Sequence, residues 1–246
     1  MTCGIKISDD ILEMSREVCK LLTKLIKNVN VLGLATGSSQ TRLYHYLIKA
    51  YRSGSIDFSS IKTFNLDEYY KINPNFSLSY RYYMDTHFFN HINLPKENIN
   101  FLNSLTNDPK NECIRYEKKI ISLGGIDCQL LGIGVNGHIA FCEPKSDFDC
   151  VTRMVKLSKD TIKQNSDGRF YKNKNEVPKY ALTMGIKTIM SAKKILVLAN
   201  GPRKAMAVKK AIEGPVTNEI PASILQRHDD VTWYLDKEAS SQLSII

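Results

Sequence analysis

Short runs of apolar and β-branched residues alternate along the chain with longer stretches in which apolar residues recur every three or four positions. The short runs predict strands at residues 29–35, 61–66, 98–102, 126–133, 194–199 and 231–235, the last of which closes the sheet. The longer stretches predict helices at residues 9–27, 80–89, 112–123 and 203–213, and one more around 43–51. This alternation is typical of an α/β fold, a mostly parallel sheet covered by helices.

Residues 159–176 break the pattern, because they are dense in Lys, Asn, Asp, Gly and Gln and their apolar residues show no period. Such a stretch inside a compact domain is more often a mobile lid than a packed element. No internal repeat, low-complexity tract or Pro/Gly/Ser-rich linker divides the sequence. We therefore expect residues 1–246 to form a single domain with a lid at about 159–176.

Length and composition indicate an ordinary globular protein. The chain has 246 residues, of which 43% are hydrophobic and 24% charged, which excludes disordered and fibrous classes. No apolar run approaches the roughly 18 residues that a membrane helix needs, and residues 1–10 lack the apolar stretch of a signal peptide. A cytoplasmic protein with no membrane partner is expected.

The formal net charge of +9 favours anionic ligands, of which nucleic acids and phosphorylated metabolites are the two main classes. The basic residues are scattered, and no zinc-finger, RNP-type or basic-zipper pattern accompanies them, so nucleic acid is not an expected partner. The six cysteines include no Cys-x-x-Cys pair and are expected to be free thiols. His87 and His91 are four residues apart, but no third ligand follows with metal spacing, so no metal site is predicted.

The first candidate site lies where the strand at 29–35 gives way to Thr36, Gly37, Ser38 and Ser39 and a helix begins. Backbone N–H groups at a helix start, with hydroxyl donors beside them, can bind an anion. A helix N-cap with a tight turn and no ligand explains the segment equally well. The segment is not a Walker A loop, because the Gly-Lys-Ser/Thr ending is missing.

Two adjacent carboxylates, Asp67 and Glu68, follow the strand at 61–66, at the sheet edge where α/β proteins bind ligands. A carboxylate partly desolvated by neighbouring aromatic residues could act as a general base. Adjacent residues of an extended chain point to opposite sides, so at most one of the two is expected to face the crevice while the other makes a structural hydrogen bond. Without further context, a helix N-cap pair is the more common role of such residues.

A glycine-rich turn at 132–137 follows the strand at 126–133 and ends at His138. Its glycines formally match the dinucleotide-binding fingerprint, but a β-like run and a proline follow where that fingerprint requires a helix. The turn leaves His138 little covered, and Glu143 could fold back to hold the imidazole. Such a histidine is suited to shuttle protons near neutral pH.

Two basic residues complete the candidates. Arg169 lies in the lid stretch, and Lys204 lies at the start of the helix at 203–213, just after an Asn-Gly-Pro turn. Each alone is most simply a surface charge. Lys204 is the more suggestive, since a lysine at a glycine-punctuated helix start suits a phosphate.

Three segments together resemble the glucosamine-6-phosphate deaminase family: Leu-Ala-Thr-Gly-Ser-Ser at 34–39, Phe-Asn-Leu-Asp-Glu-Tyr at 64–69, and Leu-Gly-Ile-Gly-Val-Asn-Gly-His-Ile-Ala-Phe-Cys-Glu-Pro at 131–144. The similarity runs over nearly the whole chain in the expected order. It implies a Rossmann-like α/β fold with an open, mostly parallel sheet and helices on both faces. It also implies an amino-sugar catabolic hydrolase that converts glucosamine 6-phosphate and water to fructose 6-phosphate and ammonia, with no cofactor and no metal.

The resemblance also implies residue roles. His138 opens the pyranose ring by moving a proton between O1 and O5, with Asn136 and Glu143 orienting its imidazole. Asp67 takes the C2 proton and returns it to C1 through an enolamine-like intermediate that loses ammonia. The implied substrate-binding residues are Thr36, Gly37, Ser38, Ser39, Glu68, Gly137, Arg169 and Lys204, of which Ser38, Ser39, Arg169 and Lys204 hold the phosphate.

The chain departs from the family's pattern at two places near these residues. Many members have Asp where this chain has Asn136, and an amide can orient His138 but supplies no charge to an imidazolium. Ring opening is therefore expected to rely more on Glu143. The lid has Asp-Gly directly before Arg169, where many relatives have Asn-Ser or Asn-Ala, which bears on how far Arg169 reaches.

Related and unrelated activities stay open at this point. A galactosamine-6-phosphate isomerase or a 6-phosphogluconolactonase would use a similar phosphate cradle, and the lactonase needs no C2 base at Asp67. A sugar-phosphate-sensing domain of a transcription regulator would need a helix-turn-helix before residue 29, where the sequence predicts one helix. The sequence leaves monomer or homo-oligomer, and the gluco or galacto epimer, undecided.

A third departure concerns regulation. Allosterically regulated relatives carry a basic pair shortly after the Glu-Pro motif, and here Arg153 is present while its partner position is Val155. We expect little activation by N-acetylglucosamine 6-phosphate, because half of the charge that would bind it is missing. Initial-rate curves with and without that sugar phosphate test this, and a clear change from sigmoidal to hyperbolic kinetics would contradict it.

Overall fold

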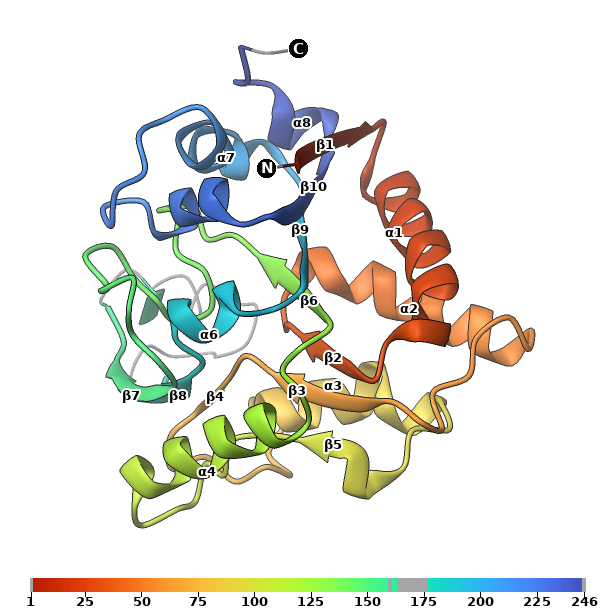
Figure 1. The fold of residues 1–246 in the computed structure, drawn as a ribbon, viewed down its shortest axis with the longest axis vertical. Coiled ribbons are helices and arrows are strands. Elements are labelled where there is room, and N and C mark those ends of the chain that lie inside the picture. Colours follow the sequence, from red (N-terminus) through yellow and green to blue (C-terminus); the bar gives the residue numbers. More distant parts are fainter. Residues whose placement is uncertain (1, 159–160, 163–176, 245–246) are drawn as a thin grey trace.

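Strands and helices alternate to build two sheets (Figure 1). The computed structural model describes residues 2–158, 161–162 and 177–244. The larger sheet is parallel throughout and contains, in spatial order, β1 (Thr2–Ser8), β10 (Asp230–Asp236), β9 (Lys194–Ala199), β6 (Cys128–Gly132), β2 (Val31–Leu34), β3 (Lys62–Asn65) and β5 (Ile99–Asn100). The smaller sheet is antiparallel and contains β4 (Asp67–Tyr69), β8 (Tyr180–Thr183) and β7 (Arg153–Lys156).

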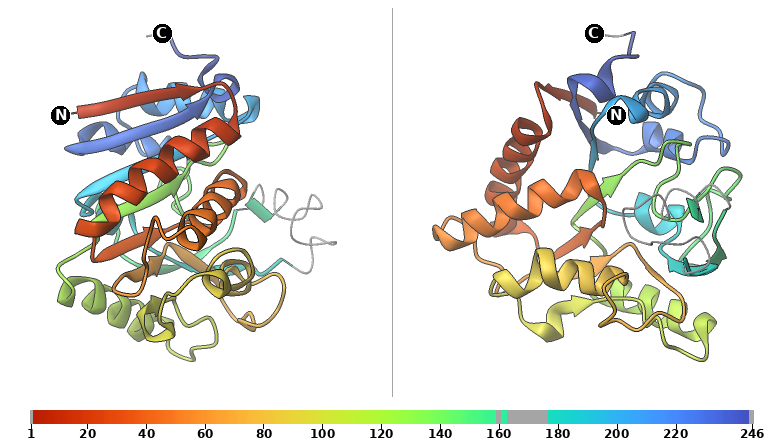
Figure 2. Two further views of the ribbon diagram at one scale, coloured as in Figure 1. Left: turned by 90° about the vertical axis from the view of Figure 1, so that its right-hand side faces the viewer. Right: turned by 180° about the vertical axis from the view of Figure 1, so that it is seen from behind.

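The larger sheet is buried on both faces, as the continuous apolar runs of its strands require. Along β9, Leu196 and Leu198 point into one core while Ile195 and Val197 point into the other. The first core is covered by α1 (Ile11–Leu25), α2 (Ser38–Arg52) and α3 (Tyr80–His87), of which α1 and α2 lie across the sheet in Figure 2. The second core is covered by α4 (Pro109–Ser122), α6 (Ile186–Met190), α7 (Ala205–Ile212) and α8 (Lys237–Ser240).

The sequence-based predictions for the central strands and the long helices are confirmed, and three details differ. The strand predicted at 98–102 shortens to β5, two residues long. The expectation that the strand at 231–235 closes the sheet is wrong, because β1 pairs in parallel with β10 and lies outside it. The small antiparallel sheet was not predicted either, since its strands are short and two of them come from segments with no clear alternation.

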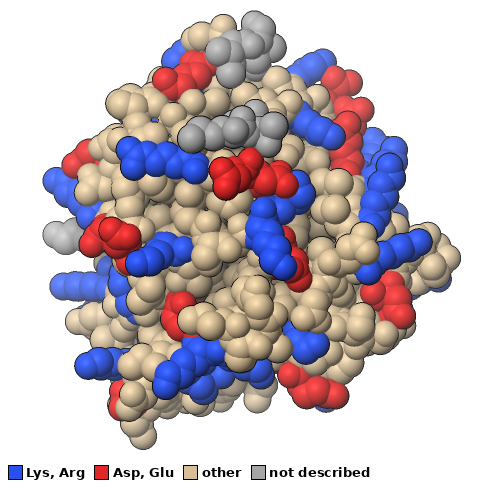
Figure 3. All heavy atoms as spheres, in the orientation of Figure 1, with Lys and Arg blue, Asp and Glu red and all other residues tan. Residues whose placement is uncertain are grey.

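The lid predicted at 159–176 lies outside the described residues, except for Thr161 and Ile162. No helix within the described part of the chain is both long and apolar enough to span a membrane. On the face seen in Figure 3, Lys and Arg are spread out and interspersed with Asp and Glu. The positive charge is therefore scattered over that face, as the sequence indicated.

One glycine tests how tightly the chain packs where it leaves the smaller sheet. A Cβ on Gly185, which follows β8, would lie 2.1 Å from the backbone oxygen of Cys150, and backbone cannot rotate away. We expect Gly185→Ala to lower the free energy of unfolding by about 2 kcal/mol or more. Urea denaturation measures this, with Gly4→Ala as the matched control, since its Cβ would meet only ordinary contacts at 3.5 Å. Equal midpoints for the two variants would contradict the prediction.

Candidate active site

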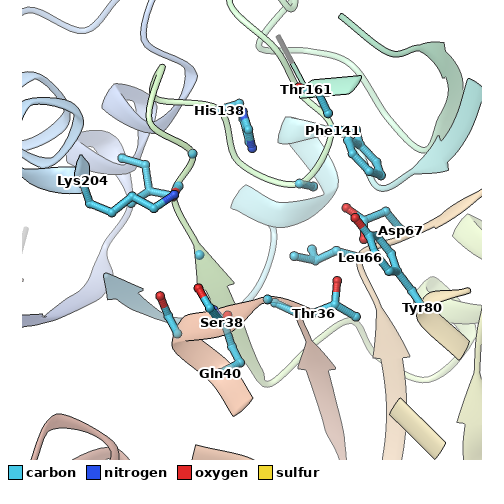
Figure 4. Close-up of a pocket in the computed structure, with 17 residues that line it drawn as sticks. Thr36, Ser38, Gln40, Leu66, Asp67, Tyr80, His138, Phe141, Thr161 and Lys204 are labelled. Atoms are coloured by element: carbon cyan, nitrogen blue, oxygen red, sulfur yellow. The ribbon is translucent and has the colours of Figure 1, made fainter. Parts of the chain in front are cut away.

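A cavity opens where four strands of the larger sheet end (Figure 4). The segments that follow β2, β3, β6 and β9 all contribute to it, which is the usual place for a ligand in an open parallel sheet. It is lined by Ala35, Thr36, Gly37, Ser38, Ser39, Gln40, Leu66, Asp67, Tyr80, Gly132, Ile133, Gly134, His138, Ala140, Phe141, Thr161 and Lys204. In Figure 4, Lys204 and Ser38 lie on one side, Asp67 on the other, and His138 above the space between them.

The side with Ser38 is built from the start of α2. The chain turns into this helix at Gly37, whose φ of 132° lies in the region that favours glycine. Among the described residues no side-chain hydrogen bond caps the helix there, and the Ser39 hydroxyl donates instead to Asn200 Oδ1 at 2.6 Å. The alternative in which the serines merely cap the helix is therefore not what the structure has.

Two further donors face the same side of the cavity. Lys204 reaches in from the segment after β9, and its Nζ donates to the carbonyl oxygen of Ile133 at 2.6 Å. The amide nitrogen of Gln40 is buried and has no hydrogen-bond partner in the described part of the chain. An ammonium group, an unsatisfied amide and the N-terminus of a 15-residue helix make this side suited to an anion.

Opposite lies Asp67, in β4. Its residue is 7% exposed, and among the described residues no hydrogen bond or ion pair stabilises its carboxylate. Burial, with a smaller contribution from the charge of Glu68, raises the pKa of Asp67 from its ordinary value of 3.8 to about 8. An ionised carboxylate of this kind holds a proton tightly and is therefore a strong base for a proton on carbon, in a fraction of molecules that grows as the pH approaches 8.

Glu68 has the opposite environment. Its carboxylate accepts hydrogen bonds from the Ser79 hydroxyl at 2.7 Å and from the N–H groups of Tyr80 and Arg81 at 3.0 and 2.8 Å, besides that of Tyr69. Burial raises the pKa of Glu68, and these four hydrogen bonds offset part of that increase. The expectation that one carboxylate faces the crevice and the other makes structural bonds is confirmed. Glu68 binds the first turn of α3 and does not line the cavity, so the substrate-binding role implied for it lacks support.

His138 packs on the glycine-rich turn that follows β6. A Cβ on Gly134 would lie 2.2 Å from the imidazole, so only glycine leaves room for the ring. His138 Nδ1 is 2.7 Å from Asn136 Oδ1, and the Asn136 amide donates to Glu143 Oε2 at 2.9 Å. Because the amide oxygen can only accept, this chain of bonds assigns the proton to Nδ1 and leaves the lone pair on Nε2.

Three opposing effects set the pKa of the His138 imidazole. Burial lowers the pKa of His138, the carboxylate of Glu143 raises it, and the nearby Lys204 lowers it, with a net decrease. Glu143 Oε2 is 3.8 Å from His138 Nδ1, so its negative charge acts on the ring directly as well as through the hydrogen bonds of Asn136. His138 is therefore neutral at physiological pH and can accept a proton.

Glu143 is in turn fixed by two hydroxyl groups. Ser158 donates to its Oε1 at 3.1 Å, and Thr161 donates to the same oxygen. Thr161 belongs to the predicted lid and also lines the cavity. The part of that segment that the structure describes thus contacts both the cavity and the group that holds the imidazole.

Two predicted site residues remain, Gly137 and Arg169. Gly137 does not line the cavity, and its carbonyl instead accepts from the N–H of Ala222, which anchors the turn. Arg169 lies outside the described residues. Within the described part of the chain, no group of three or more His, Cys, Asp or Glu side chains is placed to hold a metal ion. His87 and His91 therefore belong to no such group.

Several cavity residues were not predicted as site residues, among them four with polar or aromatic side chains: Gln40, Tyr80, Phe141 and Thr161. The rings of Tyr80 and Phe141 stack with their centroids 6.0 Å apart and form the aromatic wall beside Asp67 in Figure 4. Gln40 could have been found, since it lies on the first turn of the helix that follows the Gly-Ser-Ser segment. The other three come from segments whose placement depends on the tertiary fold.

Comparisons with known sequences agree in pointing to one family. Residues 9–233 match the family model described as "Glucosamine-6-phosphate isomerases/6-phosphogluconolactonase". The chain is 50% identical over 233 residues to a glucosamine-6-phosphate deaminase of Clostridium acetobutylicum, covering 94% of this chain and 96% of the relative. It is 53% identical over 233 residues to one of Clostridium novyi, with the same coverage.

Solved structures separate the fold from the activity. A monomeric glucosamine-6-phosphate deaminase superimposes with a TM-score of 0.94 at 40% identity, covering 97% of this chain and 99% of that one. A 6-phosphogluconolactonase from Trypanosoma brucei superimposes with a TM-score of 0.78 at 20% identity, covering 99% of both chains. The second likeness is evidence of a shared fold alone, and it confirms the predicted α/β class.

The raised pKa of Asp67 has a measurable consequence for stability. A carboxyl group whose pKa is higher in the folded state contributes stability below about pH 4 that is lost as the pH rises through 8. We expect Asp67→Asn to be more stable than the wild type by on the order of 5 kcal/mol at pH 8, and by only about 1 kcal/mol near pH 4.5. Urea unfolding at the two pH values, with the exposed Asp9→Asn as control, measures this. A stability difference that does not change with pH would refute the assigned pKa.

Proposed function

The chain belongs to the glucosamine-6-phosphate isomerase/6-phosphogluconolactonase family, and on that premise we propose how its cavity works as a glucosamine-6-phosphate deaminase. The chain converts glucosamine 6-phosphate and water to fructose 6-phosphate and ammonia. The observation that carries the assignment of roles is the buried carboxylate of Asp67, which has no partner among the described residues and lies across the cavity from the cationic side. A lactonase has no use for such a base.

The phosphate is proposed to bind at the side of the cavity with Ser38, Ser39 and Lys204. The ammonium group supplies a full positive charge, and the start of α2 adds N–H donors and the positive end of the helix dipole. The buried, unsatisfied Gln40 amide is a further donor available to this side. Arg169 remains a proposed phosphate ligand on the resemblance alone. Binding here directs the sugar ring toward His138 and Asp67.

Ring opening is proposed to use His138 Nε2. The neutral imidazole accepts the proton of the O1 hydroxyl, and the resulting imidazolium gives a proton to O5 as the C1–O5 bond breaks. Asn136 holds the ring in the required tautomer, while the negative charge that stabilises the imidazolium comes from Glu143 at 3.8 Å. Glu143 thus supplies the charge that Asn136 lacks, in keeping with the dependence on Glu143 expected from the sequence.

The carbon chemistry is proposed to use Asp67. The carboxylate removes the C2 proton of the open-chain aldehyde while a proton of the C2 ammonium group passes to O1, which gives an enolamine, and the same carboxyl group returns the C2 proton to C1. The C2–N bond is then an iminium, which water hydrolyses to the ketone of fructose 6-phosphate with release of ammonia. The aromatic wall of Tyr80 and Phe141 shields the Asp67 carboxylate from water. This makes the carboxylate a stronger base, as the removal of a proton from carbon requires.

Ammonia release tests this proposal. The wild type, given glucosamine 6-phosphate without added metal or nucleotide, should release ammonia, and Asp67→Asn should do so about 10²–10⁴-fold more slowly because the amide accepts no proton. Asp9→Asn is the control that removes a surface carboxylate and should keep wild-type rates. Galactosamine 6-phosphate, run in parallel, determines the epimer preference.

Two results would count against the proposal. Full activity of Asp67→Asn would exclude this carboxylate as the C2 base. No ammonia from either sugar would exclude the reaction, and hydrolysis of 6-phosphogluconolactone would then be measured.

A further inference from the structure

Two cysteines meet one arginine beside the substrate cavity. Cys142 directly precedes Glu143, Cys150 lies in the loop that follows, and Arg153 begins β7. Arg153 Nη1 lies 2.8 Å from Cys150 Sγ and 3.7 Å from Cys142 Sγ. One guanidinium nitrogen therefore contacts both sulfur atoms, and the mechanism proposed above uses neither thiol.

Hydrogen-bond directions distinguish the two thiols. Cys142 Sγ is 3.5 Å from the carbonyl oxygen of Met184, which can only accept, so Cys142 is the protonated partner. Cys150 Sγ accepts from the Arg153 guanidinium and from the N–H of Ile186 at 3.3 Å, and neither of these groups can accept in return. The surroundings of Cys150 are those of a thiolate.

The electrostatics agree with these directions. The neighbouring Cys142 thiol, the N–H of Ile186 and the charge of Arg153 lower the pKa of Cys150 to about 6, against the opposing effects of burial and of Asp147. The neighbouring Cys150, together with burial, raises the pKa of Cys142. A low-pKa thiol beside a protonated one is the arrangement of an attacking and a resolving cysteine.

The other described cysteines differ from this pair. Cys19, Cys113 and Cys128 are buried, and burial raises the pKa of each, to about 11 for Cys113 and about 12 for Cys128. Of the five cysteines whose side chains the structure describes, Cys150 alone is partly exposed to solvent. Among these five, small reagents in solution should therefore reach Cys150 first.

We propose that Cys150 is a reactive thiolate site for small disulfides and soft electrophiles, with Cys142 as its resolving thiol. The Cys150 thiolate attacks one sulfur of a small disulfide, which forms a mixed disulfide and expels the other half as a thiolate. Cys142 then loses its proton to solvent and attacks the Cys150 sulfur, which expels the second half. The protein loses two hydrogens as the Cys142–Cys150 bond forms, and the small disulfide is reduced to two thiols.

The intrachain disulfide has a direct route to the proposed active site. Cys142 and Glu143 share a peptide bond, and Glu143 holds Asn136 and faces His138. A bond of about 2.05 Å between the two sulfurs constrains the residue next to this carboxylate and removes the thiolate that Arg153 contacts. We expect ammonia release to slow in the oxidised protein. This effect rests on the proposed function, whereas the thiol chemistry does not.

Alkylation by iodoacetamide tests the thiolate. Peptide mass mapping should find Cys150 modified first, with a rate that rises with pH around a midpoint near 6. Arg153→Leu should raise that midpoint and slow the reaction about tenfold at pH 6.5. Arg16→Leu, on the outside of α1, is the matched control and should leave the profile unchanged. A midpoint near 8.5 in the wild type, or modification of another cysteine first, would overturn the proposal.

Hydroxyethyl disulfide tests the resolving step. The wild type should end as the intrachain disulfide, with two hydrogens lost; Cys142→Ser should stop at the mixed disulfide on Cys150; and Cys150→Ser should form no disulfide at Cys142. A mixed disulfide that persists in the wild type would exclude Cys142 as the resolving thiol. Oxidised wild type should release ammonia more slowly until dithiothreitol is added, while Cys150→Ser should be unaffected. If the reduced protein releases no ammonia at all, the proposed function fails, while the mass measurements still decide the thiol proposal.

Discussion

A parallel sheet buried on both faces makes unpaired polar side chains along its strands costly, and among the described residues of these strands only a few, Thr63, Asn65 and Gln129, carry a buried polar atom without a partner. In this chain, apolar residues on both faces of β9 and its neighbours fill two separate cores, so polar residues collect where the strands end. Strands β2, β3, β6 and β9 end at the same edge of the sheet. The segments that follow them bring together a helix N-terminus, a carboxylate, an imidazole and an ammonium group. The cavity and its chemistry therefore follow from the burial of the sheet.

This constraint also explains how much of the fold could be predicted from the sequence. The central strands are continuous apolar runs because both of their faces are buried, and such runs stand out in a sequence. The edge strand β1 has an exposed side, and the short strands β7 and β8 pair with each other away from the larger sheet. The local sequence pattern of these three strands is therefore weak. The strand at 98–102 was overestimated because only two of its residues pair with β3.

The candidate site divides along the same line. Thr36 to Ser39 and Asp67 directly follow predicted strands, and His138 ends the glycine-rich turn after another, and residues in such positions can be recognised without a structure. Tyr80, Phe141 and Thr161 reach the cavity through contacts with distant segments, which no local pattern records. The different fates of Asp67 and Glu68 were predictable in kind, from the alternation of a strand, but which of them meets α3 depends on where that helix packs.

The amide at position 136 changes the balance of charge around the sugar phosphate. With an aspartate there, the imidazole would stand between two carboxylates; with Asn136, Glu143 is the one negative charge bonded to this relay in the described part of the chain. An incoming dianion therefore meets less repulsion at the moment of binding, while the cation that forms during ring opening has a single counter-ion to rely on. Asn136 therefore favours binding of the sugar phosphate and gives up some stabilisation of the transition state, so that tighter binding is accompanied by slower turnover.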